Sequence, residues 1–310
     1  MHSLRAYPGF ALAVLITLGL AGVIGLMVLL MQLQPGFLGM AHFTDPRHRT
    51  HDLTYGFLFT TAIVGMLAQL KRPSKNVAGQ LMALIPWLAL LLAAVLSTDV
   101  RVIRSAERIL VAAGTVIAVL LHPARRDFFR SFSVSRVNWV MLALVIIAAV
   151  PLLAFASTNI GLQGTVADDH AGMGHYGFMA AFGFTVIGAG LLASLRPAGW
   201  RLTAWVAGLL PALLGFASVV FPDVSSSLGL VWAVAAIAWG VVFVAAAQLT
   251  QTHVADQPRY PDTGDDTGLG PDRGPTASTP RWVYVSGIIT IVLVLLFVVM
   301  HLTGGGLRGH

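Results

Sequence analysis

The stretch WVMLALVIIAAVPLLAFA, residues 139–156, contains eighteen consecutive residues without a charge. An α-helix needs about 20 apolar residues to cross the hydrocarbon core of a bilayer, so this stretch predicts a transmembrane helix. The whole chain agrees with this, since 56% of its 310 residues are hydrophobic and 10% are charged. A soluble domain carries roughly 25% charged residues. Because so few charges cannot cover a water-facing surface, lipid must be the solvent for much of the chain.

Similar apolar runs recur along the chain and predict an all-α, polytopic membrane protein of about nine transmembrane helices. The predicted spans are 9–33, 53–70, 77–96, 102–121, 137–156, 175–195, 202–221, 228–249 and 282–302. The fourth span is the weakest, because Arg104, Glu107 and Arg108 interrupt its first turns. Residues 251–280 carry five Asp, five Pro and four Gly, a composition that predicts a disordered cytoplasmic linker.

Sequence landmarks recur in the same order in the two halves of the chain. Tyr55-Gly56-Phe57 matches Tyr176-Gly177-Phe178, Lys71-Arg72-Pro73 matches Leu195-Arg196-Pro197, Pro86 matches Pro211, and Asp99 matches Asp223. This order predicts two tandem, parallel four-helix repeats. The predicted units are residues 1–136 and 137–250, followed by the linker 251–280 and by a ninth helix with a His-containing outer tail, 281–310.

The basic residues predict how the chain lies in the membrane. Thirteen Lys and Arg residues fall on the side of the N-terminus and six on the opposite side. The N-terminus is therefore expected in the cytoplasm and the C-terminus outside the cell membrane. The net charge of +6 comes from these loop residues, so the expected partners are the lipid bilayer and other respiratory or membrane subunits rather than nucleic acid. The chain has no cysteine, which excludes disulfides and thiolate metal sites.

Seven of the ten histidines fall on the predicted outer side: His42, His48, His51, His170, His175, His301 and His310. The two outer loops that are equivalent under the repeat both place His beside Asp, and a parallel repeat brings such loops together. Imidazole suits Zn, Cu and Fe, whereas a thioether favours Cu(I). The candidate metal ligands are His48, His51, His170, Met173 and His175. His170 and Met173 are three residues apart, while His175 is expected to point elsewhere on the same helix.

The same region is the candidate site for a larger cofactor, either haem b or a quinol. The candidate binding residues are His51, His175, His170, Tyr55, Arg104 and Arg108, with Tyr176 as a further helper. Arg101, Arg104 and Arg108 form a stripe where the fourth span enters the membrane, and Arg104 and Arg108 would bind anionic groups such as haem propionates. Ordinary ion pairing with Asp99 and Glu107 is the alternative interpretation of this stripe.

Two tandem four-helix units with outer-face histidines resemble, in layout, the haem A synthase type of enzyme and the quinol-handling anchor subunits of respiratory oxidoreductases. The resemblance covers the first eight spans and implies a haem held by histidines on the second and sixth helices. His51 and His175 (or His170) take those positions here. The outer halves of the fourth and eighth spans have no His, so the two-haem ligation of those bundles is not expected.

The sequence therefore favours a redox or cofactor-binding membrane subunit. Two alternatives stay open: a transporter or channel with an outer metal or pH sensor, and a structural membrane scaffold. No Asp, Glu, Lys or Arg lies near the middle of any predicted span, although ion-coupled transporters usually need such a residue. The pattern does not decide whether the protein is an enzyme.

Overall fold

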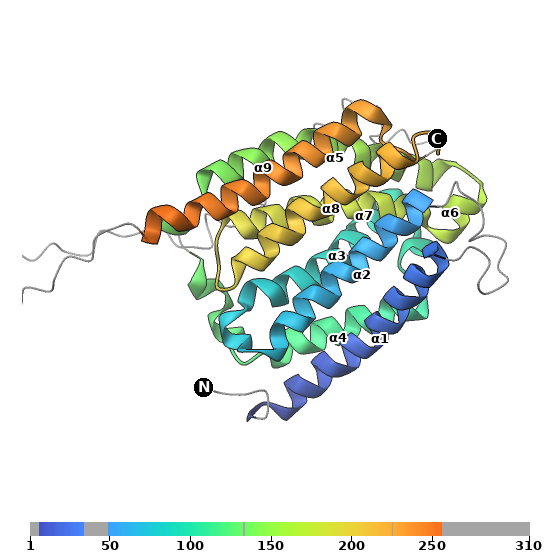
Figure 1. Cartoon of the computed structure of the whole chain (residues 1–310). Coiled ribbons are helices and arrows are strands. Elements are labelled where there is room, and N and C mark those ends of the chain that lie inside the picture. Colours follow the sequence, from blue (N-terminus) through green and yellow to red (C-terminus); the bar gives the residue numbers. More distant parts are fainter. Residues whose placement is uncertain (1–5, 34–48, 133, 225, 256–310) are drawn as a thin grey trace, which may run out of the picture.

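The computed structural model describes residues 6–33, 49–132, 134–224 and 226–255, and in these ranges every regular element is a helix (Figure 1). The α-helices are α1 (Pro8–Leu33), α2 (Arg49–Leu67), α3 (Val77–Ser97), α4 (Ala106–Leu121), α5 (Trp139–Thr165), α6 (Asp169–Met173), α7 (His175–Ser194), α8 (Trp200–Val220) and α9 (Gly229–Ala255). Short 3-10 helices connect them: η4 (Ala68–Leu70), η5 (Pro73–Lys75), η6 (Val100–Val102), η7 (Arg125–Ser131) and η8 (Val134–Arg136).

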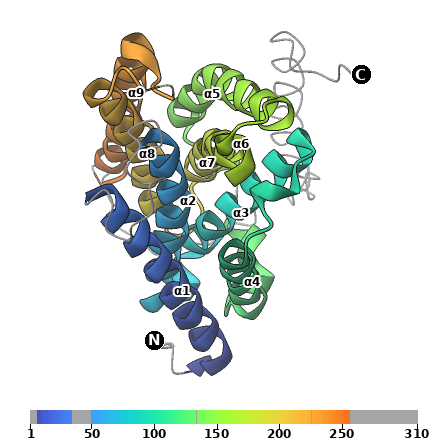
Figure 2. The same cartoon turned by 90° about the vertical axis from the view of Figure 1, so that its right-hand side faces the viewer.

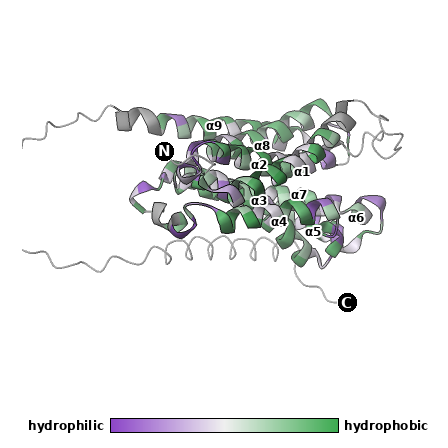
Figure 3. Ribbon diagram, turned by 90° about the horizontal axis from the view of Figure 1, so that it is seen from below, coloured by the Kyte–Doolittle hydropathy of each residue, from purple (hydrophilic) through white to green (hydrophobic). Residues whose placement is uncertain are grey.

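Seven of the described helices are long and apolar enough to cross a membrane, namely α1, α2, α3, α5, α7, α8 and α9. Their outward faces carry many exposed large apolar side chains, such as Leu15, Ile147 and Val231, and Figure 3 shows hydrophobic colouring along the helices. Both features suit helices that face lipid. About nine spans were predicted, and seven are found within the described residues. The predicted ninth span, 282–302, lies outside these residues.

The predicted fourth span, 102–121, is shorter than expected. Helix α4 begins at Ala106 and has 16 residues, which corresponds to about 24 Å of helix, less than the hydrocarbon core. Helix α3 ends where Thr98 takes a left-handed conformation (φ 53°). The carboxylate of Asp99 then accepts a hydrogen bond from the backbone N–H of Arg101 at 2.9 Å and so starts η6. This turn occupies the residues that were expected to form the first turn of the span.

Helix α5 is longer than the predicted span 137–156, because it continues to Thr165. The extra turns contain polar residues, which lower the mean hydropathy from which the span was predicted. Thr158, Asn159 and Thr165 donate side-chain hydrogen bonds to carbonyls four residues earlier, at 3.1, 2.9 and 2.7 Å. These bonds satisfy the polar side chains within the helix itself, so the helix continues.

Helix α7 is the central element of the bundle and packs against α2, α3, α5 and α8 (Figure 2). Of its span, 89% is buried, against 22% for α9. Small residues allow the close packing: a Cβ at Gly190 would lie 2.7 Å from Val145 on α5, and one at Gly177 would lie 2.4 Å from Val102 in η6. The N-terminus of α7, together with α6, therefore has a fixed place at one end of the bundle.

Candidate cofactor site

Three imidazole rings from three helices meet at one end of the bundle. The ring centre of His51 on α2 lies 4.9 Å from that of His170 on α6 and 5.5 Å from that of His175 on α7, and the last two are 5.9 Å apart. His51 and His175 are 2% and 6% exposed, while 15% of the His170 side chain is exposed. We call His51, His170 and His175 the imidazole cluster. The structure thus brings together residues that are far apart in the sequence.

A break in the chain between α6 and α7 makes this meeting possible. His170 and His175 were expected on one helix with His175 pointing away, and this expectation is wrong. Gly174 has a φ of +84° and ends α6, so that α7 begins in a new direction at His175. A Cβ at this position would also lie 3.3 Å from the Cα of Val102. Only glycine adopts this conformation without strain.

Asp168 organises the exposed side of the imidazole cluster. As the N-cap of α6, its carboxylate accepts a hydrogen bond from the Ala171 N–H at 2.8 Å. It also accepts one from the Tyr176 hydroxyl at 2.9 Å and lies 3.6 Å from Nδ1 of His170. Burial acts to raise the pKa of Asp168, but these hydrogen bonds and the nearby His170 lower it below its usual range. The carboxylate of Asp168 thus links the start of α6 to Tyr176 and lies beside the ring of His170.

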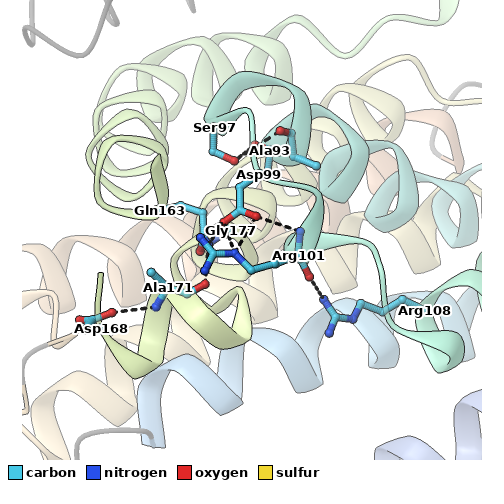
Figure 4. Close-up of polar contacts among 10 residues, drawn as sticks. Ala93, Ser97, Asp99, Arg101, Arg108, Gln163, Asp168, Ala171 and Gly177 are labelled. Carbon is cyan, nitrogen blue, oxygen red and sulfur yellow. Dashed lines mark hydrogen bonds and ion pairs between the residues drawn. The ribbon is translucent and has the colours of Figure 1, made fainter. Parts of the chain in front are cut away.

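A buried polar network behind the imidazole cluster fixes its backbone (Figure 4). The amide nitrogen of Gln163 on α5 donates to Asp99 at 2.6 Å and to the Ala171 carbonyl at 2.7 Å, and its amide oxygen accepts from the Gly177 N–H at 3.1 Å. Burial acts to raise the pKa of Asp99, yet the hydrogen bonds from Arg101 and Gln163 hold it below its usual range. Gln163 was not predicted as a site residue, because one Gln in an apolar helix has no partner that the sequence reveals.

Two of the three arginines in the predicted stripe, Arg101 and Arg108, contact groups of the protein itself. Arg108 donates to the carbonyls of Arg101 and Val102 at 3.0 and 2.6 Å, and its guanidinium lies 4.8 Å from the ring centre of Phe178. Arg101 pairs with Asp99 at 2.8 Å. Arg104 is exposed. The ion-pairing interpretation of this stripe is thus closer to the observed contacts of Arg101 and Arg108 than an open anion site.

Tyr55 lies one aromatic layer away from the imidazole cluster. Its ring centre is 4.6 Å from that of Phe178, and its hydroxyl donates to Glu107 at 3.4 Å. Phe178 in turn lies 5.8 Å from His175. Tyr55 is therefore a support for the site, whereas Tyr176 is a direct neighbour, since its ring centre lies 5.7 Å from that of His51.

Two further predicted metal ligands have less direct places. Met173 is the last residue of α6, partly exposed and three residues from His170. His48 lies outside the described residues. As the side chains stand, no group of three or more His, Asp or Glu residues in the described ranges is arranged to hold a metal ion.

The spacing of the rings is nevertheless close to that of a three-imidazole metal site. With metal–nitrogen bonds near 2.0 Å, each ring centre lies about 3.2 Å from the ion, so tetrahedral or trigonal ligands have ring centres about 5.2–5.5 Å apart. The observed separations, 4.9, 5.5 and 5.9 Å, span these values.

Comparisons of the chain with protein-family models, curated proteins and solved structures give no match.

Proposed function

We propose that the chain is an integral protein of the cell membrane, with its N-terminus in the cytoplasm and the imidazole cluster at the extracytoplasmic end. The excess of Lys and Arg on the N-terminal side supports this orientation. We also infer two parallel four-helix units, 1–136 and 137–250, plus a C-terminal helix.

Matching turns and packing support the duplication. Arg72 after α2 and Arg196 after α7 both take left-handed conformations, with φ of 56° and 51°, and each precedes a proline. Helix α2 packs against α3 as α7 packs against α8, whereas α4 packs mainly against α1 and its counterpart α9 mainly against α8.

The function that the geometry supports best is the binding of one transition-metal ion, for which copper is the preferred candidate. The chain would then be a cofactor-binding or electron-transfer subunit of the membrane. His51, His170 and His175 would be its ligands. The observation that carries the proposal is the ring separation of 4.9–5.9 Å among three mostly buried imidazoles. Imidazole is a good copper ligand, and the thioether of Met173, one turn from His170, would supply a soft fourth ligand for Cu(I).

This arrangement suits a single ion better than haem b. A bis-imidazole haem holds two ring centres about 6 Å apart, on opposite faces of the porphyrin. Here the rings of His51 and His175 are 5.5 Å apart and stacked at 28°, and the third ring lies against both. The separation of His170 and His175, 5.9 Å, equals that of a bis-imidazole haem, but the ring of His51 lies against both and occupies the space that a porphyrin would need.

The test is elemental analysis of the protein purified from copper-supplemented cells, with visible and paramagnetic resonance spectra. We expect about one copper per chain, and background levels in His51→Ala and His175→Ala. His122→Gln is the matched control, because His122 is also buried but belongs to another part of the bundle, between α4 and η7. Protein that is colourless and metal-free, and that gains no copper on titration, would overturn the proposal. A haem band or zinc alone would overturn the assignment to copper.

A further inference from the structure

A large apolar groove lies between α5, α8 and α9, with part of α7 as its floor. Its volume is about 580 Å³, within the range of about 300–1,000 Å³ for sites that bind small organic molecules. The lining residues that matter for the argument are Phe155, Thr158, Phe182, Ser227, Trp232 and Trp239.

The chemistry of the groove selects a neutral ligand that contains a flat ring. Four aromatic side chains from three helices, Phe155, Phe182, Trp232 and Trp239, line it, and such rings bind planar groups by stacking or edge contacts. No lining residue carries a charge, so the phosphate of a phospholipid would find no partner there. The hydroxyls of Thr158 and Ser227 donate to the carbonyls of Ala154 and Ser218, so their oxygens are left to accept hydrogen bonds from a neutral head such as the hydroxyl of a quinol.

The polar end of the groove is connected to the imidazole cluster through two intervening residues, Ser226 and Thr50. Ser227 follows Ser226, whose hydroxyl hydrogen-bonds with that of Thr50, the residue before His51. On the groove floor, Phe182 packs against Phe57 of α2, with ring centres 5.8 Å apart, and Leu53 belongs to the same apolar cluster. The groove therefore extends from the apolar middle of the bundle to Ser227, and Ser226 connects that end to the first turn of α2.

We propose that this groove binds a lipid-soluble quinone or quinol, with the hydrocarbon tail toward Ile147 and Trp239 and the ring toward Thr158 and Ser227. The inference rests on the proposed membrane placement, and it does not require a metal in the imidazole cluster. Binding alone is proposed, and no electron transfer.

The test uses quenching of tryptophan fluorescence by a decyl-substituted benzoquinone, added to the purified full-length chain in detergent. Trp232 and Trp239 line the groove, so we expect saturable quenching. Ala236→Phe fills the groove and should weaken binding at least tenfold. Ala238→Phe is the matched control on the same helix, because Ala238 is exposed and does not line the groove, and it should bind like the unmodified chain.

Three results would overturn the inference: quenching that rises linearly without saturation, equal binding by Ala236→Phe and the unmodified chain, or displacement of the probe by phosphatidylglycerol at equal concentration. The last result would make the groove a general lipid site. His51→Ala distinguishes this inference from the metal proposal, because the variant should no longer bind copper but should bind the quinone like the unmodified chain.

Discussion

At the scale of single residues, Gln163 has the clearest structural role near the imidazole cluster. Its 1% exposed side chain joins α5 to η6, α6 and α7 through three hydrogen bonds. We expect Gln163→Leu to cost about 1–3 kcal/mol, because buried partners lose their bonds. We also expect copper affinity to fall, because the backbone near His170 and His175 loses its hydrogen bonds to Gln163. Thermal unfolding and copper titration in detergent measure the two effects.

Gln69 provides the matched control for that substitution. It is also fully buried and makes three bonds: it donates to the carbonyls of Gly65 and Asn76 at 3.1 and 3.0 Å and contacts His122 at 3.2 Å. Gln69→Leu should destabilise the chain to a similar degree and leave copper affinity unchanged. Equal losses of affinity in both variants would show that Gln163 acts only through overall stability.

His122 predicts a dependence of stability on pH. Its Nδ1 accepts from the Ala124 N–H at 3.1 Å, its ring packs against Phe10 and Phe128, and burial lowers its pKa to about 4 from 6.5. Between these two pH values the unfolded chain binds a proton that the native chain excludes. The contribution of His122 to the free energy of unfolding is therefore fully present above about pH 6.5. It falls by about 3 kcal/mol as the pH decreases to 4.

The measurement is the melting temperature of the unmodified chain and of His122→Gln between pH 7.5 and 4. The variant should show the smaller decrease over this interval, whereas acidic groups with lowered pKa, such as Asp99 and Asp168, lose their contribution at lower pH in both proteins. Parallel curves would contradict the assignment of this pH dependence to His122.

The sequence identified three of the residues that meet in the candidate site, because histidines in two outer loops of a repeat stand out in an apolar chain. It did not identify the groups that hold them. Asp99 stood out only as a repeat landmark and as a possible ion-pair partner of the arginine stripe, and nothing in the sequence links it to Gln163, 64 positions away. The charge of Arg108 is visible in the sequence and led to its prediction as an anion ligand, whereas its hydrogen bonds to the carbonyls of Arg101 and Val102 appear only in the structure.

At the scale of elements, the turn at Gly174 decides whether His170 and His175 meet. Gly174→Ala places a side chain at a φ of +84° and near Val102. We therefore expect the free energy of unfolding to fall by about 1–2 kcal/mol or more, and we expect the variant to lose copper binding. Gly172→Ala is the control within α6, since a Cβ there meets no atom within 4 Å. Unfolding and copper titration report the result; normal copper binding by Gly174→Ala would show that the turn is dispensable.

Most helices were predictable because long apolar runs have few alternatives in lipid. The predicted spans 77–96 and 175–195 differ by one residue from α3 and α7, which end at Ser97 and Ser194. The predicted helix ends differ most from the observed ones where polar side chains form hydrogen bonds with the nearby backbone. Such bonds lengthened α5 beyond its apolar run, and the Asp99 cap removed the first turns of the predicted fourth span.

At the scale of the whole molecule, the absence of native cysteine makes the proposed orientation directly testable. Ala167→Cys and Lys75→Cys each introduce a single thiol at an exposed position at opposite ends of the bundle. In intact cells, a membrane-impermeant maleimide should label Ala167→Cys, whereas Lys75→Cys should react only after permeabilisation. The reverse pattern would place the imidazole cluster in the cytoplasm.

The enclosed position of α7 has a consequence for biosynthesis. Its neighbours α2, α3 and α5 precede it in the chain, and α8 follows and completes its enclosure. Every residue of the imidazole cluster and of the Gln163 network lies before Ser194, so a nascent chain that has just inserted α7 already contains all three imidazoles and the groups that hold them. If the cluster binds copper as proposed, metal loading does not have to wait until α8 and α9 have inserted into the membrane.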